Sequence, residues 1–104
     1  VVLVVVGRLE RARVESLASR HRIAARLRFV GPSDDVGAYY AACDSFALPT
    51  TYEAWGLVIV EAAASGLPVI TSRLAGASVA ISPGHNGYLL ADPTDVEELT
   101  ARLR

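Results

Sequence analysis

Short apolar runs that stop at glycine or proline alternate, along this chain, with longer segments whose apolar residues recur every three or four positions. Runs of the first kind predict strands, and segments of the second kind predict helices. The opening run, residues 1–6, is continuous and largely β-branched, which predicts a strand buried on both faces. Further strands are predicted at 27–30, 45–48, 68–71 and 87–90, and helices at 10–27, 36–43, 56–65 and 94–103.

This alternation predicts βαβ units, and therefore an α/β fold with a Rossmann-like parallel sheet and helices on both faces. A chain of 104 residues is long enough for one domain and too short for two, so we expect a single domain over 1–104. Ligands bind such sheets beyond the carboxyl ends of the strands. The loops to search for chemistry are therefore 7–10, 31–35, 49–56, 72–78 and 91–94.

Composition narrows the classes of partner. The formal net charge of -1 argues against a nucleic-acid partner and gives no reason to expect an anionic membrane surface. The one cysteine, Cys43, has no partner for an internal disulfide, which fits a reducing compartment and a cytoplasmic location. Methionine and lysine are both absent, and all ten basic residues are arginine. We therefore expect the chain to be a piece of a longer parent protein.

The loop between the third predicted strand and the helix at 56–65 concentrates the candidate chemistry. Glu53 stands just before this helix, and Glu61 lies in its second turn. Gly56, at the helix start, lets a ligand approach the backbone closely. The free amides of Gly56, Leu57 and Val58, together with the helix dipole, form an anion site of the kind that ordinarily holds phosphate.

Glu61 is the unusual residue of this helix, because its neighbours at 58–60 and 62–64 are all apolar. The helix is therefore predicted to be packed in on nearly all sides. A carboxylate there is costly unless it is paired or faces a polar cleft, and beside a phosphate site it suits the two adjacent hydroxyl groups of a ribose. The alternatives are that Glu61 lies on a narrow solvated stripe, and that Glu53 is simply an acid favourable to the helix dipole.

The segment 48–69 resembles the signature of retaining glycosyltransferases of the GT-B fold (glycosyltransferase group 1, family 4). It carries Glu53, Trp55-Gly56, Glu61-Ala62 and Gly66-Leu67-Pro68-Val69 in the register of that signature. Similar residues recur over most of the chain, at 29–31, 40–44, 84–88 and 92–93. The resemblance implies that this is the carboxyl-terminal, donor-binding half of a GT-B enzyme.

The resemblance also implies roles for residues of the loop and helix start. Glu53 is the implied catalytic residue, because it would contact the transferred sugar and support positive charge near its anomeric carbon. Backbone groups of Trp55, Gly56 and Leu57 would hold sugar hydroxyls. Those of Leu57 and Val58 would bind the diphosphate of the nucleotide-sugar donor.

Further donor contacts are implied elsewhere. Glu61 would accept the ribose hydroxyls, and Val30 and Gly31, which end the second strand, would lie near the base. No metal or other cofactor is implied, because helix amides and basic side chains neutralise the leaving diphosphate. This agrees with the lack of any ligand-spaced His/Cys/Asp cluster; His21 and His85 are interpreted as ordinary solvated histidines.

Two departures from the family pattern limit what is implied. Leu9 replaces the second glycine of a Gly-x-Gly motif. After the fourth strand, Ala75 and Val79 replace the first glycine and the acid of a Gly-Gly-x-x-Glu motif that contacts the donor sugar in the family. Spacing places the family's first strand, with its Arg and Lys, upstream of Val1. We therefore expect a hexosyltransferase-type parent whose acceptor site, and any peripheral membrane association, belong to an amino-terminal domain, and an isolated chain that is inactive.

Two other interpretations remain open at this stage. One is a non-catalytic nucleotide-binding or scaffolding domain, against which the retention of Glu53 and Glu61 argues. The other is a flavodoxin-like or receiver domain, but a receiver's acidic pair and lysine are absent.

The family's strand order, 3-2-1-4-5-6, predicts that 1–6 pairs in parallel with 27–30 while the other three strands form a separate block. The gap left by the first strand predicts poor stability of the isolated chain.

Overall fold

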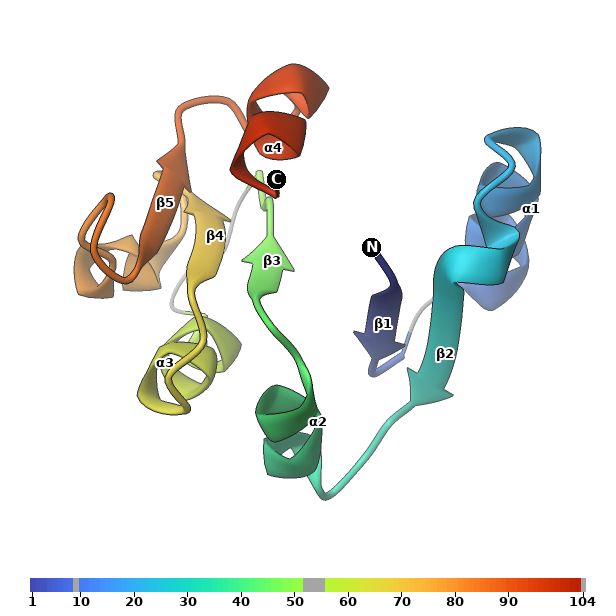
Figure 1. Cartoon of the computed structure of the whole chain (residues 1–104), viewed down its shortest axis with the longest axis horizontal. Coiled ribbons are helices and arrows are strands. Elements are labelled where there is room, and N and C mark those ends of the chain that lie inside the picture. Colours follow the sequence, from blue (N-terminus) through green and yellow to red (C-terminus); the bar gives the residue numbers. More distant parts are fainter. Residues whose placement is uncertain (9, 52–55, 104) are drawn as a thin grey trace. The chain divides into compact units, whose positions relative to one another are not determined.

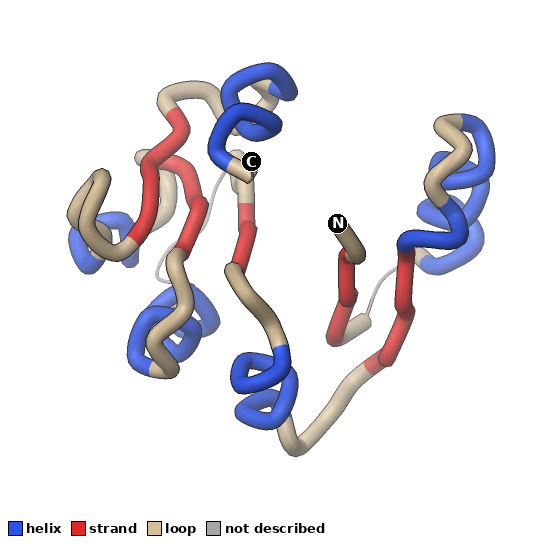
Figure 2. Tube along the Cα trace, in the orientation of Figure 1, coloured by secondary structure: helices blue, strands red, loops and turns tan. Residues whose placement is uncertain are grey.

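The computed structural model describes residues 1–8, 10–51 and 56–103. Strands and helices alternate along the chain (Figure 2), and every strand pair is parallel. The α/β class expected from the sequence is therefore confirmed. The chain forms two compact units, residues 1–36 and 37–104, and each is described by itself. Within the described ranges, no helix is long and apolar enough to cross a membrane.

The first unit is a two-stranded parallel sheet with one helix. Strand β1 pairs with β2 from Leu3 opposite Leu27 to Val6 opposite Gly31, as the sequence predicted (Figure 1). The connection between the two strands contains a helix and a single 3₁₀ turn, as expected for a parallel pair. The elements are β1 (Leu3–Val6), α1 (Arg11–Arg20), η1 (Ala24–Arg26) and β2 (Leu27–Gly31).

The helix predicted at 10–27 is too long, because α1 ends at Arg20. Arg22 has a φ of 58°, a left-handed conformation that a right-handed helix cannot continue. The amide of Ile23 donates to the carbonyl of Ala18 over 2.9 Å and closes the helix end. Apolar spacing continues through Ile23 to Leu27, which is why the pattern alone predicted a single helix.

The prediction that 1–6 is a strand buried on both faces is also wrong. The strand begins only at Leu3, and Val1, Val2 and Leu3 are 86%, 57% and 52% exposed. Ala18 is the one buried hydrophobic residue among those described in the first unit. This unit therefore has little core of its own, and its apolar strand is covered only in part.

The second unit contains a three-stranded parallel sheet in the order β3-β4-β5, the separate block that the sequence predicted. Helices α3 and α4 lie on opposite faces of this sheet (Figure 1). The 3₁₀ helix η2, which the sequence did not predict, packs beside α3. The elements are α2 (Val36–Ala42), which leads into the unit, β3 (Phe46–Leu48), α3 (Leu57–Ala64), β4 (Val69–Ser72), η2 (Gly76–Ala80), β5 (Gly87–Leu90) and α4 (Val96–Arg102).

The core of the second unit lies around β4, whose four residues are all buried. Ile59 and Ala62 of α3 and Leu90 of β5 have no exposed surface. The buried hydroxyl of Thr71 donates to the carbonyl of Leu48 over 2.9 Å, so this polar group is satisfied. That bond fixes the carboxyl ends of β3 and β4 against each other, at the edge from which the loop 49–56 departs.

Helix α4 begins later than predicted. The sequence placed the start at Asp92-Pro93-Thr94, whereas the helix begins at Val96 with Asp95 as its N-cap. The carboxylate of Asp95 accepts from the amide of Glu98 over 2.9 Å, which satisfies one of the free amides of the first turn. Asp92 instead closes a local turn, because its carboxylate accepts from the amide and the hydroxyl of Thr94.

Candidate functional site

The amino end of α3 is the segment that the sequence predicts to be an anion site. Gly56 precedes the helix with a φ of 83° and a ψ of 57°, a left-handed conformation that favours glycine. The amide of Ile59 donates to the carbonyl of Gly56 over 3.0 Å, so the helix's own hydrogen bonding starts there. The amides of Gly56, Leu57 and Val58 are thus left to partners outside the helix, and the helix dipole favours an anion beside them.

Helix α3 buries one face rather than being packed in on nearly all sides, and that prediction is wrong. Ile59 and Ala62 are fully buried, whereas Leu57 and Val58 are 62% and 42% exposed. Glu61 is exposed as well. Its carboxylate therefore carries no large desolvation cost, and it is accessible beside the amides at the helix start.

Glu61 is nonetheless held by a buried partner. The hydroxyl of Tyr40, on α2, donates to Oε2 of Glu61 over 3.3 Å and lies 3.4 Å from the carbonyl oxygen of Val58. Tyr40 is only 8% exposed, and its ring meets that of Phe46 edge-on at a centroid distance of 6.1 Å. Burial, and then the charge of Glu61 and its hydrogen bond, raise the pKa of the Tyr40 hydroxyl. The hydroxyl therefore keeps its proton at neutral pH and acts as a hydrogen-bond donor.

Sequence reasoning missed the role of Tyr40. The residue was noted only within the resemblance, and its distance along the chain from Glu61 carries no periodic signal. A tyrosine, rather than a phenylalanine, on the core side of a short apolar helix is the signal that was available, because a buried hydroxyl requires a partner.

A second feature, in the first unit, is a pocket of about 460 Å³ at the carboxyl ends of β1 and β2. The amide of Gly7 donates to the carbonyl of Gly31 over 2.8 Å and closes the sheet at this edge. Val30 and Gly31, the residues predicted to lie near a nucleotide base, both line the pocket. The full lining is Gly7, Arg8, Arg11, Phe29, Val30, Gly31 and Pro32.

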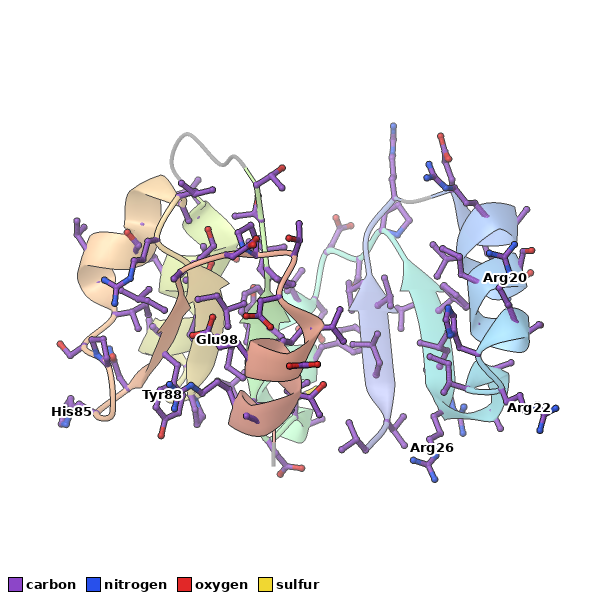
Figure 3. All side chains as sticks on the ribbon, turned by 90° about the horizontal axis from the view of Figure 1, so that it is seen from above. Arg20, Arg22, Arg26, His85, Tyr88 and Glu98 are labelled. Carbon is purple, nitrogen blue, oxygen red and sulfur yellow. The ribbon has the colours of Figure 1, made fainter. Side chains whose placement is uncertain are left out.

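The pocket is basic. The guanidinium group of Arg11 lies 5.1 Å from the centroid of the Phe29 ring, and its Nε donates to Glu15 over 2.7 Å. Seven of the ten arginines belong to residues 1–36, whereas seven of the eleven acidic residues belong to 37–104. In the side-chain view, Arg20, Arg22 and Arg26 are labelled on the first unit as well (Figure 3). The charge of this unit thus favours an anionic ligand.

Arg8 and Arg11 are pocket residues that sequence reasoning did not assign. The loop 7–10 was among those to search, because it follows a strand end, but the resemblance placed no ligand contact there. Exposed arginines are common on helix surfaces, so their residue type alone gave no signal.

Two predicted site residues, Glu53 and Trp55, lie outside the described residues, and so does any geometry that relates Glu53 to Glu61. His21 and His85 are both exposed, as expected of solvated histidines. Across 1–8, 10–51 and 56–103, no group of three His, Cys, Asp or Glu side chains is placed to hold a metal ion. That the chemistry requires no metal stays a prediction.

Comparison with known proteins gives a consistent result. A family profile described as "Glycosyl transferases group 1" matches residues 1–104. The glycogen synthase of Mycobacterium tuberculosis is 40% identical over 89 residues, which cover 84% of this chain and 21% of that protein. The lipopolysaccharide glucosyltransferase WaaG of Escherichia coli is 33% identical over 103 residues, which cover 99% of this chain and 28% of that protein.

Solved structures agree with these relatives. The crystal structure of WaaG, a glycosyltransferase involved in lipopolysaccharide biosynthesis, matches with a TM-score of 0.92 at 33% identity, over 99% of this chain and 28% of that one. Anabaena HepE in complex with UDP matches with a TM-score of 0.85 at 34% identity, over 97% of this chain and 29% of that one. The chain therefore spans between 21% and 29% of the length of these proteins.

Proposed function

Because the chain belongs to the group 1 glycosyl transferases, we propose that its intact parent transfers a hexosyl group from a nucleotide-sugar to an acceptor, with retention of anomeric configuration. Residues 1–104 hold the donor in this proposal. The observation that carries it is the amino end of α3, where a left-handed Gly56 and exposed helix-start residues are followed one turn later by Glu61. A related protein, Anabaena HepE, has been crystallised with UDP, which supports a nucleotide as ligand.

The diphosphate lies, in this proposal, against the amides of Leu57 and Val58. Those amides have no partner within the helix, and the positive end of the helix dipole favours negative charge there. The left-handed Gly56 supports this assignment, because it admits a ligand close to the backbone.

The carboxylate of Glu61 accepts hydrogen bonds from the two adjacent ribose hydroxyls. It is exposed, so it reaches a ligand without prior rearrangement, and it stands one helical turn from the phosphate-binding amides. In a nucleoside diphosphate, the distance between the ribose hydroxyls and the diphosphate is similarly short. Together, the hydrogen bonds to this charged acceptor contribute about 1.5–3 kcal/mol of affinity.

The base is assigned to the pocket that Val30 and Gly31 line. Phe29 also lines this pocket and contributes an aromatic ring to it. Arg8 and Arg11 add positive charge to this pocket of the first unit, which favours a nucleotide over an uncharged ligand.

Glu53 supports the positive charge that develops near the anomeric carbon, and backbone groups of Trp55, Gly56 and Leu57 hold the sugar hydroxyls. A carboxylate in that role acts mainly in the transition state, because the charge it stabilises is absent from the ground state. Helix amides and arginines neutralise the leaving diphosphate, so turnover proceeds without a metal. Full activity after exhaustive treatment with EDTA is the expected outcome.

The remaining parts of the reaction belong to segments of the parent outside residues 1–104. The acceptor binds there, and any peripheral contact with a membrane is made there. Residues 1–104 alone are expected to bind the donor without turnover. Within residues 1–104, Cys43 has no second cysteine to pair with, which fits a reducing, cytoplasmic setting.

The experiment uses the intact parent. A thermal-shift screen with UDP-, GDP- and ADP-sugars first identifies the donor, because a ligand that binds the folded state raises the melting temperature. Glu61→Ala and Glu53→Ala are then compared with Glu97→Ala, a matched change at an acidic residue on α4. Glu61→Ala is expected to raise the donor Kd, at a cost of about 1.5–3 kcal/mol, whereas Glu53→Ala lowers kcat more than it raises the Kd.

Two results would contradict the proposal. One is a Glu53→Ala variant whose kcat equals that of the Glu97→Ala control. The other is a parent that no nucleotide-sugar stabilises, which would favour a scaffolding domain instead.

A further inference from the structure

We propose that Tyr40 is a positioning residue for the donor ribose, because its buried hydroxyl holds the exposed carboxylate of Glu61 in the orientation that accepts the ribose hydroxyls. The inference rests on the proposed function, since it takes Glu61 as the ribose acceptor. It adds a residue that touches no substrate and acts only through Glu61.

The first argument is the contrast in burial between the two partners. Glu61 is exposed on α3, and a solvated glutamate samples many rotamers. Fixing one of them on binding costs conformational entropy. Tyr40 is 8% exposed and comes from a different helix, and its ring is further fixed by edge-on contact with Phe46. A rigid donor thus holds one oxygen of a flexible carboxylate, 3.3 Å away, before any ligand arrives.

The second argument is the number of acceptor positions. An ionised carboxylate offers about four lone-pair positions on its two oxygens. Tyr40 supplies one proton and uses one position on Oε2, so about three remain for two ribose hydroxyls. The contact therefore orients Glu61 without competing with the ligand.

The third argument is that the Tyr40 hydroxyl has two acceptors, of which Glu61 is one. The carbonyl oxygen of Val58 lies 3.4 Å from the Tyr40 hydroxyl, so the one proton faces both Glu61 and the first turn of α3. That turn carries the amides assigned to the diphosphate. Tyr40 therefore fixes the position of the Glu61 carboxylate relative to the first turn of α3, because one rigid hydroxyl contacts both the carboxylate and the carbonyl of Val58.

The protonation state is consistent with this role. Burial and the nearby carboxylate raise the pKa of Tyr40, so the hydroxyl keeps its proton throughout the neutral range. The charged partner of the hydroxyl is Glu61 on α3. Tyr39 on α2 and Cys43 just after it are the neighbouring titratable residues along the chain.

The test measures ribose recognition directly in the intact parent. The probes are UDP, GDP or ADP, whichever binds most tightly, and the matching 2′-deoxynucleoside diphosphate. The ratio of the two dissociation constants reports the contribution of the 2′-hydroxyl and cancels any general loss of stability. It is measured for the wild type, Tyr40→Phe, Glu61→Ala and the double variant, with Tyr39→Phe as the matched control on the same helix.

In the wild type we expect the deoxynucleotide to bind about tenfold more weakly, the effect of losing one hydrogen bond to a charged group. Tyr40→Phe keeps the ring and removes only the hydroxyl, and should lower this ratio about threefold while Tyr39→Phe leaves it unchanged. Glu61→Ala should bring the ratio close to one. Adding Tyr40→Phe to Glu61→Ala should then change nothing more, because Tyr40 acts through Glu61.

A Tyr40→Phe variant that keeps the wild-type ratio, while Glu61→Ala loses it, overturns the role of Tyr40 and leaves the proposed function standing. Additive effects of the two changes on the ratio likewise overturn it, because Tyr40 would then act by another route. A wild-type ratio near one, or a ratio that Glu61→Ala does not alter, instead overturns the assignment of Glu61 to the ribose and the inference with it.

Discussion

The amide of Gly7 donates to the carbonyl of Gly31 over 2.8 Å, and both glycines have a left-handed φ, 121° and 77°. This bond joins the carboxyl ends of β1 and β2 where they border the pocket. Both glycines line the pocket in a conformation that other residues rarely adopt. The two glycines therefore shape the opening of the pocket.

We predict that Gly31→Ala destabilises the parent by about 1–2 kcal/mol, the cost of a side chain in the left-handed region. A Cβ added at position 31 would have no other atom within 4 Å, so the cost comes from the backbone alone. Gly37→Ala is the control, because Gly37 lies in α2 with equally open space. There the change should stabilise by up to about 1 kcal/mol.

Urea denaturation of the parent measures the free energy of unfolding of both variants. Equal effects of the two substitutions on the free energy of unfolding would contradict the assignment of strain to Gly31.

Gly87 has a different reason to be glycine. A Cβ at this position would collide with the backbone of Val69, the residue opposite it on β4. We predict that Gly87→Ala is more destabilising than Gly31→Ala, because backbone of a fully buried strand has to move. The free energy of unfolding from the same urea titration checks the order, and a loss smaller than that of Gly31→Ala would contradict it.

Asp92 provides a pH-dependent prediction. Hydrogen bonds from the hydroxyl and the amide of Thr94 lower the pKa of its carboxyl group. A lowered folded-state pKa means that the ionised form stabilises the turn above the ordinary pKa, and that this contribution is lost as the pH falls through the lowered value. Because Asp92 is fully exposed, the effect is local to the turn before α4.

A carboxyl NMR titration of Asp92 measures this. Thr94→Val removes the hydroxyl, which makes the larger contribution, and should raise the pKa of Asp92 toward its ordinary value. Thr100→Val is the control on α4, because its hydroxyl bonds to the carbonyl of Val96 and not to a carboxylate. An Asp92 pKa that is the same in the Thr94→Val and Thr100→Val variants would contradict the stated cause.

The strands were predictable because glycine or proline residues stand where their apolar runs begin or end. β5 was predicted to the residue, and β2 and β4 to within one position, since Gly31, Pro68 and Gly87 mark where pairing starts or stops. The parallel pairing of β1 with β2 was also predicted. It followed from the family's strand order, and a helical crossover links the two strands.

Other features left no mark in the sequence. The end of α1 is set by the left-handed Arg22, and an arginine gives no signal for a conformation that glycine or asparagine usually adopts. The 3₁₀ turn at Gly76–Ala80 has no apolar period to reveal it. Exposure of Leu57 and Val1 was not predictable, because an apolar run indicates that burial is favourable and not which segment provides it.

The same division holds for the site. The helix start at Gly56 was predictable, because a glycine before a helix is visible in the sequence. That the amides of Gly56 to Val58 bind an anion stays a prediction. The contact between Tyr40 and Glu61 was not predictable, since it depends on how α2 packs against α3. The basic pocket likewise joins residues that the sequence separates, from the loop after β1, from helix α1 and from strand β2.

Hydrogen–deuterium exchange on the intact parent, with and without the nucleoside diphosphate that binds most tightly among UDP, GDP and ADP, tests the donor site most directly. Amides that bind a ligand exchange more slowly. The predicted result is protection at Leu57 and Val58, where the diphosphate binds, and at Val30 and Gly31, where the base binds, while helix α4 is unchanged. Saturating nucleotide that protects other segments and leaves the exchange of Leu57 and Val58 unaltered would contradict the assignment of the donor to this chain.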